Sequence, residues 1–269
     1  MKRLSFLTQH GKAPLVAESL AGCGFQVETC SLFDTDRFGT FSRETERPGS
    51  AHETALAKAR LAAEMGGSRY GLGSEGSFGR DPYLGMLPWN SELLCWWDRE
   101  RSYAVYASQG SSNTNYAHRE VRSLNEALNF AEAADFPTHA LILGRHGEPW
   151  FRKGIAQRDV LETLVSQVLR SQPALWLETD MRAHLNPLRQ SVIRSAAQRL
   201  AQRLAQQCPR CTAVGFGIDH YQHGQPCRAC RLPTPRHAAE HWLCPACGHT
   251  ECRATEEPAD PVHCQHCNP

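Results

Sequence analysis

The sequence predicts an α/β domain with a mixed sheet, followed by a small module of zinc ribbons. Strand-like and helix-like segments alternate over roughly the first two hundred residues, as in layered α/β architectures. One predicted hairpin interrupts the alternation, so the sheet is expected to be mixed rather than fully parallel. Beyond Gln207 the chain carries nine cysteines. We therefore expect a catalytic α/β domain over residues 1–207 and tandem four-cysteine zinc ribbons over residues 208–269.

Helix starts in the first domain are marked by side chains that cap exposed backbone amides. Ser50 with Glu53, and Ser123 with Glu126, have the capping-box spacing, in which each side chain satisfies the other's helix-start amide. The first of these helices is expected to end at Gly66–Gly67, where the chain turns left-handed at little cost. The predicted helices span residues 14–21, 52–65, 124–134, 158–171 and 187–207.

Strands are predicted where apolar and β-branched runs are bounded by turn residues. ELLCWWD and SYAVYA flank a charged turn and predict the hairpin. RYGLGSEGSFG predicts a short strand running into a glycine-rich turn, with Glu75 at the strand end between Gly73 and Gly76. The other predicted strands span residues 3–9, 25–30, 138–144 and 174–179.

Composition excludes several classes of function. The net charge is +1 and 41% of residues are apolar, so a bulk electrostatic grip on nucleic acid or on an anionic membrane is not indicated. No run of about 18 apolar residues predicts a membrane span, and the amino terminus turns polar too early for a signal peptide. We expect a soluble cytoplasmic protein with no membrane partner.

The cysteine pairs predict two structural zinc ions. Four C-x-x-C pairs have the spacing of four-cysteine sites, and a site with four thiolates leaves no open position for water. Sequential pairing, first with second and third with fourth, gives two ribbons in tandem. A cross-braced arrangement, first pair with third, is the alternative. The predicted ligands are Cys208, Cys211, Cys227, Cys230, Cys244, Cys247, Cys264 and Cys267.

The ribbons suggest contact with RNA or with protein. The segment after Gln207 has five arginines, no lysine and six acids, so a protein partner is at least as well supported as RNA. The last helix of the first domain is more basic, since it carries Arg189, Arg194, Arg199 and Arg203. Those arginines form either an RNA-binding face or an ordinary solvated face.

Three separated stretches near the amino terminus carry candidate chemistry. TQHGK, with Thr8, His10 and Lys12, joins a strand to a helix, and helix-start amides beside a lysine form a natural anion site. The second stretch places Glu46 before the capped helix and Lys58 within it. The third presents Glu75 between glycines, where a carboxylate can approach a metal ion or phosphate closely. Asp34 and Asp36 have a spacing that can chelate a metal ion, but Asp-Thr-Asp is also common turn chemistry, which we favour.

In order and spacing, these stretches resemble the inosine triphosphate pyrophosphatase family over residues 4–79. LTQHGK looks like that family's T-x-N-x-x-G-K loop, HETALAKARLAAE like its E-N-A-x-x-K-A helix, and GLGSEGS like its acidic strand end. The resemblance implies that Lys12 neutralises triphosphate charge and that Glu46 and Glu75 hold magnesium or activate water. Thr8, His10 and Lys58 stand in the matching motifs as substrate-binding residues.

Over nearly its full length the chain also resembles a bacterial family of unknown function. The shared motifs are DTDRFGTF, SEGSFG, ETDMRAH-NP and the cysteine-rich tail. This resemblance implies no established activity.

The stretch ALWLETDMRAHLNPLRQ adds a fourth candidate segment. Asn186 and Pro187 are explained as a helix start, because asparagine caps well and proline fits the first helical position. The charged residues before them are not explained in this way. In the pyrophosphatase-like interpretation Asp180 is catalytic and Glu178 is a further magnesium ligand, while Arg182, His184 and Arg189 contact phosphate or base. A salt-bridged structural turn is the alternative.

Two functional hypotheses follow. The first is a hydrolase of nucleoside triphosphates or related phosphoanhydrides, dependent on Mg²⁺ or Mn²⁺ and resembling the nucleoside triphosphate pyrophosphohydrolases, with the zinc ribbons as an accessory module. The second is a zinc protein that binds a nucleotide or RNA without turnover. Turnover of a nucleotide panel separates them.

Overall fold

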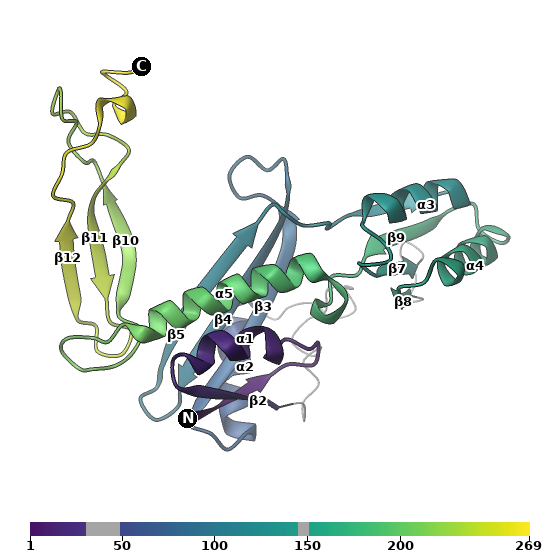
Figure 1. Ribbon diagram of the computed structural model, residues 1–269, viewed down its shortest axis with the longest axis horizontal. Helices are drawn as coiled ribbons and strands as arrows, with labels where there is room; N and C mark the ends of the chain where they lie inside the picture. Colours follow the sequence, from purple (N-terminus) through teal and green to yellow (C-terminus); the bar gives the residue numbers. More distant parts are fainter. Residues whose placement is uncertain (31–48, 145–150) are drawn as a thin grey trace. The chain divides into compact units, whose positions relative to one another are not determined.

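The structure is a computed structural model that describes residues 1–30, 49–144 and 151–269 (Figure 1). It divides into two compact units, Met1–Arg99 with Tyr106–Leu200 and Glu100–Val105 with Ala201–Pro269. The second unit therefore includes the turn between the two strands of the predicted hairpin. The domain boundary expected at Gln207–Cys208 stays a prediction. No helix of the described residues is long and apolar enough to cross a membrane.

The first unit contains the predicted mixed sheet. Its five strands have the order β2-β1-β3-β4-β5; β1 runs parallel to both β2 and β3, and β3 runs antiparallel to β4. Mixed pairing in an α/β core confirms the fold class expected from the sequence. The strands are β1 Lys2–Leu7, β2 Phe25–Cys30, β3 Tyr70–Arg80, β4 Pro88–Asp98 and β5 Tyr103–Ser111.

Two helices connect the parallel strands, α1 (Ala13–Ala21) and α2 (Ala51–Met65). The predicted capping box opens α2: the Ser50 hydroxyl accepts from the Glu53 amide at 3.2 Å, and the Glu53 carboxylate accepts from the Ser50 amide at 2.8 Å. The helix ends at the predicted glycines, and Gly67 has a φ of +60°.

The prediction that this strand is short and runs into a glycine-rich turn is wrong, because β3 continues without a turn from Tyr70 to Arg80. Its glycines serve close packing against α2 instead of a turn. A Cβ on Gly71 would lie 1.8 Å from the Ala59 carbonyl oxygen, and one on Gly73 would lie 2.0 Å from that of Ala55. Only β3 residues up to Leu72 pair with β1, so the rest of β3 extends beyond the end of the parallel strand.

The first unit also contains an antiparallel sheet, and two of its strands were not predicted. Its order is β6-β9-β7-β8, and α3 and α4 pack on it through a core that includes Leu143, Leu161 and Leu177. The edge strands β6 and β8 are short and rich in charged residues, so they lack an apolar strand signal. The elements are β6 His118–Val121, α3 Leu124–Ala133, β7 Leu141–Gly144, β8 Phe151–Ile155, α4 Arg158–Leu169 and β9 Leu175–Thr179.

The second predicted capping box forms only in part. The Ser123 hydroxyl accepts from the Glu126 amide at 3.1 Å, as expected. The Glu126 carboxylate, however, accepts from the Arg122 amide at 2.8 Å. Ser123 therefore caps the helix as predicted, but the reciprocal hydrogen bond of the capping box goes to Arg122 instead.

The long helix α5 (Pro187–Ala205) begins where the sequence predicts. Asn186 caps it, since its Oδ1 accepts from the Arg189 amide at 2.9 Å. The Asn186 amide nitrogen donates to Oδ1 of Asn115 at 2.9 Å, which ties the helix start to the segment before β6. A single 3₁₀ turn, Ala183–Leu185, joins β9 to this cap.

The second unit is built around a three-stranded antiparallel sheet, visible at the carboxyl-terminal end of the chain in Figure 1. Its strands are β10 (Gly217–His223), β11 (His237–Leu243) and β12 (Thr250–Ala254). Each strand lies between two consecutive C-x-x-C pairs in the sequence. This order along the chain decides which cysteines meet.

Candidate functional site

The eight paired cysteines form two four-thiol groups suited to two structural zinc ions. The groups are Cys208, Cys211, Cys244 and Cys247, and Cys227, Cys230, Cys264 and Cys267. The Sγ–Sγ distances between the two cysteine pairs of each group are 3.5–3.9 Å. A tetrahedron with Zn–S bonds of about 2.3 Å has edges of about 3.8 Å, so the thiols fit zinc and are far too distant for disulfides.

Sequential pairing of the cysteines is wrong, because the two groups are cross-braced. The first C-x-x-C pair meets the third, and the second meets the fourth. The antiparallel strands explain this. A seven-residue strand such as β10 is roughly 20 Å long, so it carries the chain from one end of the sheet to the other before the next pair. Odd pairs therefore gather at one end of the sheet and even pairs at the other.

Each C-x-x-C pair forms the tight turn that a four-thiolate site requires. In every pair the residue after the second cysteine donates its amide to the carbonyl of the first cysteine, at 2.8–3.0 Å. Gly248, the residue after Cys247, has a φ of +70°, a left-handed conformation that glycine adopts at little cost. The residues at the equivalent places are Thr212, Arg231 and Asn268.

Lys12 lies buried in the loop between β1 and α1, as the N-cap residue of α1. Its Nζ donates to the Ser74 hydroxyl at 3.1 Å. Burial, followed by the nearby Arg189 guanidinium, lowers the pKa of Lys12 to about 8, although Glu92 opposes the shift. Ser74 was not anticipated from the sequence.

Lys58 and Glu75 form a buried ion pair between α2 and β3. Both side chains are 10% exposed or less. Glu75 is the acid that the sequence placed at a strand end, and it does lie beyond the last residue of β3 that pairs with β1. Its neighbour Ser74 contacts Lys12, so two successive β3 residues each hold one of the predicted lysines.

Arg189 forms the most deeply buried ion pair of the first unit among those described. Its Nε donates to Glu92 at 2.7 Å, with side-chain exposures of 0% and 2%, and it also donates to the Met181 carbonyl. Gly76 leaves room for this contact, since a Cβ there would lie 2.5 Å from Arg189 Nη2. Sequence reasoning missed Glu92. Its signal was an acid at the head of the apolar run ELLCWW.

These residues form one charged group, which we call the cationic cluster: Lys12, Lys58, Arg189, Glu75 and Glu92. All five are at most 8% exposed. The charges of the other four act on Lys12. Three cations face two carboxylates, so the cluster carries a net charge of +1 when all are ionised.

A second group of predicted residues lies in the segments that follow β1 and β9. Asp180 is fully buried, and its carboxylate accepts from the Arg182 side chain at 2.7 Å and from the Gly154 amide at 3.1 Å. The rings of His10 and His184 stack with centroids 5.7 Å apart. The structure therefore brings the TQHGK loop, with its buried Thr8, to the segment around Asp180.

In this second group, Asp180 holds Arg182 in place. Burial and the Arg182 guanidinium lower the pKa of His184, which favours its neutral form. A neutral imidazole can accept a proton or a hydrogen bond.

The expected magnesium ligands are not gathered into one site by the described residues. Glu178 lies on β9, where its carboxylate accepts from the Trp176 indole. Glu46 lies outside the described residues, and so do Asp34 and Asp36, which were favoured as turn residues. Within residues 1–30, 49–144 and 151–269, the two cysteine groups are the sets of three or more metal-ligating side chains close enough to share an ion. Glu75 remains the predicted magnesium ligand that lies in the cationic cluster.

The arginines of α5 do not act as one basic face. Arg189 is committed to Glu92, and Arg203 donates to the carbonyl oxygens of Gly215 and Ile218 at 3.0 and 2.7 Å. Arg194 and Arg199 are exposed. Two of the four arginines thus have structural partners.

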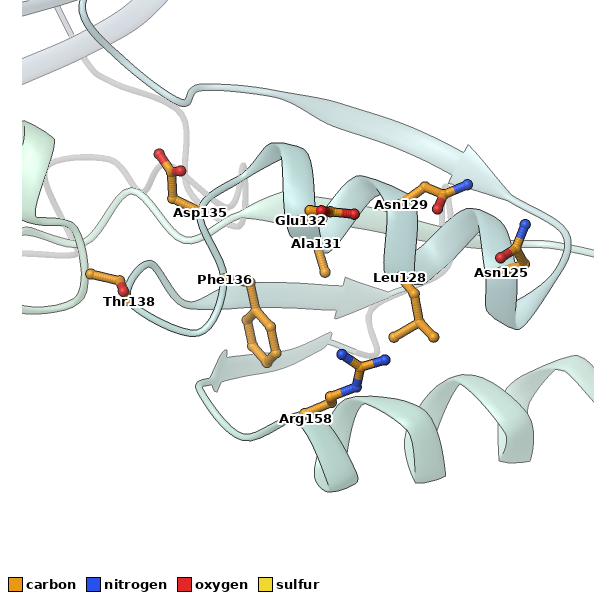
Figure 2. A pocket seen from close by; sticks show the side chains of 9 residues that line it. All are labelled: Asn125, Leu128, Asn129, Ala131, Glu132, Asp135, Phe136, Thr138 and Arg158. Carbon is orange, nitrogen blue, oxygen red and sulfur yellow. The ribbon is translucent and has the colours of Figure 1, made fainter.

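An open cavity of about 600 Å³ lies beside α3 and the start of α4 (Figure 2). Figure 2 shows Phe136 and Leu128 from the α3 region pointing toward the side of α4 on which Arg158 lies. Polar side chains such as Asn125 and Glu132 complete its lining. None of the residues predicted from the sequence lines this cavity, so it adds nothing to the candidate chemistry.

Comparisons with curated proteins and with solved structures find no match. No named relative supports the resemblance to the inosine triphosphate pyrophosphatases, which stays a prediction. Among protein families, residues 58–269 match a domain of unknown function, DUF6671. That span covers more than half of the chain and includes β3, β4, α5 and both four-cysteine groups. The chain therefore belongs to the DUF6671 family.

Proposed function

We propose that the cationic cluster binds the phosphates of a nucleoside triphosphate or a related phosphoanhydride, and that the protein hydrolyses this ligand with Mg²⁺ or Mn²⁺. The observation that carries the proposal is the buried excess of positive charge. Burying a charge away from water is costly, and the lowered pKa of Lys12 reflects that burial. A bound phosphate group would supply the missing negative charge.

The surroundings of the cluster favour an anion with several oxygens. Lys12 is the N-cap residue of α1, so the positive end of the helix dipole adds to its charge. Thr54 lies one helical turn before Lys58 and is buried, and its Oγ1 has no hydrogen-bond partner among the described residues. A phosphate oxygen could accept from this hydroxyl as well as from both lysines.

Hydrolysis is proposed from the place of Glu75. Magnesium in phosphate sites takes one or two carboxylates and completes its shell with water and phosphate oxygens. Glu75 could provide one carboxylate once Lys58 turns to a phosphate, and the sequence resemblance implies Glu46 as the second. The ion would orient water and offset charge developing on phosphorus.

Turnover of a nucleotide panel with Mg²⁺ or Mn²⁺ tests the proposal. Release of phosphate or pyrophosphate is expected from the wild type, with a loss of about 100-fold in Glu75→Gln because a neutral amide oxygen binds Mg²⁺ far more weakly than a carboxylate. Glu120→Gln is the matched control, since Glu120 is an exposed carboxylate paired with Arg122. Its rate should equal that of the wild type.

Two other results would be informative. Thermal stabilisation by nucleotides without turnover would replace the hydrolase with the binding protein that was the alternative hypothesis. If nucleotides cause neither thermal stabilisation nor turnover, the whole proposal is contradicted.

The pKa of Lys12 predicts a specific pH dependence of anion binding. Because the pKa is about 8 in the free protein, Lys12 is protonated below that pH and attracts phosphate. Above pH 8 binding must first restore the proton, so affinity for tripolyphosphate should fall by up to about tenfold per pH unit. Calorimetry from pH 7 to 9.5 measures this, and Lys12→Met should flatten the slope. An unchanged slope in the variant would exclude Lys12 from the site.

Protein stability should show the opposite trend over the same pH range. The unfolded chain keeps the Lys12 proton up to about pH 10.5, so between pH 8 and 10.5 it binds more protons than the folded chain. Charged Lys12 therefore lowers stability below pH 8, and this penalty is relieved as the pH rises. Lys12→Met should be more stable than the wild type at pH 7, by a margin that shrinks toward pH 10.5.

A further inference from the structure

Asn90 is a buried amide that has no hydrogen-bond partner among the described residues. It lies in β4 and is fully buried, and both Nδ2 and Oδ1 are unpaired. Burying an amide in this way is unfavourable, because its hydrogen bonds to water are lost and nothing replaces them. A leucine would fill a similar volume without that cost. An asparagine here therefore indicates a ligand that completes its hydrogen bonds.

On β4, Asn90 lies two residues before Glu92, which belongs to the cationic cluster. The β3–β4 register pairs Asn90 with Phe78, and Glu92 with Gly76. Alternate residues of a strand share a face, so Asn90 and Glu92 lie on the same face of the sheet. Arg189, which bonds Glu92, has its guanidinium carbon 5.2 Å from the centroid of the Phe78 ring.

A phosphate group alone cannot satisfy both hydrogen-bonding atoms of the unpaired Asn90 amide. Phosphate oxygens accept hydrogen bonds, so they could satisfy Nδ2 of Asn90 but not its Oδ1. A nucleobase edge presents a donor beside an acceptor, which is the arrangement that an asparagine amide binds in a bidentate manner. Phe78 is partly exposed, and the Tyr116 ring lies 5.6 Å from it, so aromatic surface for stacking is at hand.

On these grounds we infer that the ligand of the cationic cluster is a nucleotide, and that Asn90 pairs with the edge of its base. The inference rests on the proposed function. Lys12 bonds Ser74, and Phe78 lies four residues further along β3, about 13 Å away, which separates a phosphate end from a base end. Since Asn90 is closed off in the free protein, entry of the base displaces Phe78, its cross-strand neighbour.

The test compares nucleoside triphosphates with tripolyphosphate on the full-length, zinc-loaded protein, by calorimetry in the presence of Mg²⁺. In the wild type at least one of ATP, GTP, ITP, CTP and UTP should bind roughly 10- to 100-fold more tightly than tripolyphosphate. Asn90→Leu should remove that preference while leaving affinity for tripolyphosphate unchanged. The free variant should also melt at a higher temperature than the wild type. Asn129→Leu, at an exposed asparagine of α3, is the matched control and should keep the preference.

The outcomes separate the inference from the proposed function. If tripolyphosphate binds and no nucleotide binds more tightly, the inference is overturned while the phosphate site stands, and this comparison needs no variant. A nucleotide preference that survives in Asn90→Leu also overturns it. If neither tripolyphosphate nor any nucleotide binds, the proposed function itself fails.

Discussion

Replacing Cys208 and Cys244 together with serine is expected to remove one zinc ion and leave the other, whereas replacing Cys208 and Cys227 together should remove both. The first pair of substitutions falls within one four-thiol group, and the second takes one ligand from each group. Structural zinc contributes roughly 10–16 kcal/mol of apparent binding free energy at neutral pH, so losing both ions should unfold the β10–β12 sheet. Metal analysis after dialysis against a chelator gives the zinc content of each variant.

Sequential ribbons would give the reverse result, with both ions affected by the first double variant and one retained by the second. Cys252→Ser is the matched control, because Cys252 is an exposed cysteine outside both groups. It should keep two zinc ions per chain. Fewer than two ions in the wild type would contradict the two-zinc assignment itself.

Replacing Arg189 with methionine is expected to destabilise the first unit by roughly 3–5 kcal/mol. The substitution leaves the Glu92 carboxylate buried without its ion partner, and it leaves the Met181 carbonyl without its donor. A fall of this size is a large share of the stability of a typical domain. Urea unfolding followed by tryptophan fluorescence measures it.

A double variant and a surface control distinguish a buried ion pair from a general effect of losing an arginine. Arg189→Met with Glu92→Leu should recover part of the stability, because no unpaired charge remains. Arg122→Met removes an exposed pair, with side-chain exposures of 72% and 47%, and should change stability by no more than about 1 kcal/mol. If Arg189→Met and Arg122→Met lower the free energy of unfolding equally, the buried ion pair contributes no more to stability than the exposed one.

Local signals in the sequence were sufficient for most helices and for the chemistry of the cysteine pairs. Ser50 and Asn186 cap the helices they were expected to cap, because capping depends on residues within one turn. The mixed sheet followed from a hairpin placed after alternating strands and helices. The edge strands β6 and β8 were missed, since short charged strands are specified by their neighbours more than by their own pattern.

The sequence identified several residues of the candidate site, but it did not identify the residues with which they pair. Lys12, Lys58 and Arg189 were identified from motifs, and the structure brings all three into the cationic cluster. Their partners Ser74 and Glu92 carried no comparable signal. Glu178 was expected as a further magnesium ligand of the same site, yet it lies on the antiparallel sheet and accepts a hydrogen bond from the Trp176 indole.

What the sequence by itself determined are properties that depend on short spacings: the helix caps, most of the helices, and eight cysteines in pairs that each supply half of a zinc tetrahedron. The tertiary structure decided which halves meet. Antiparallel strands between the cysteine pairs place alternate pairs at the same end of the sheet, so the first pair meets the third and the second meets the fourth. It likewise decided that Arg189 meets Glu92, 97 positions earlier in the chain. Contacts at such separations depend on how sheets and helices pack, and no local pattern records them.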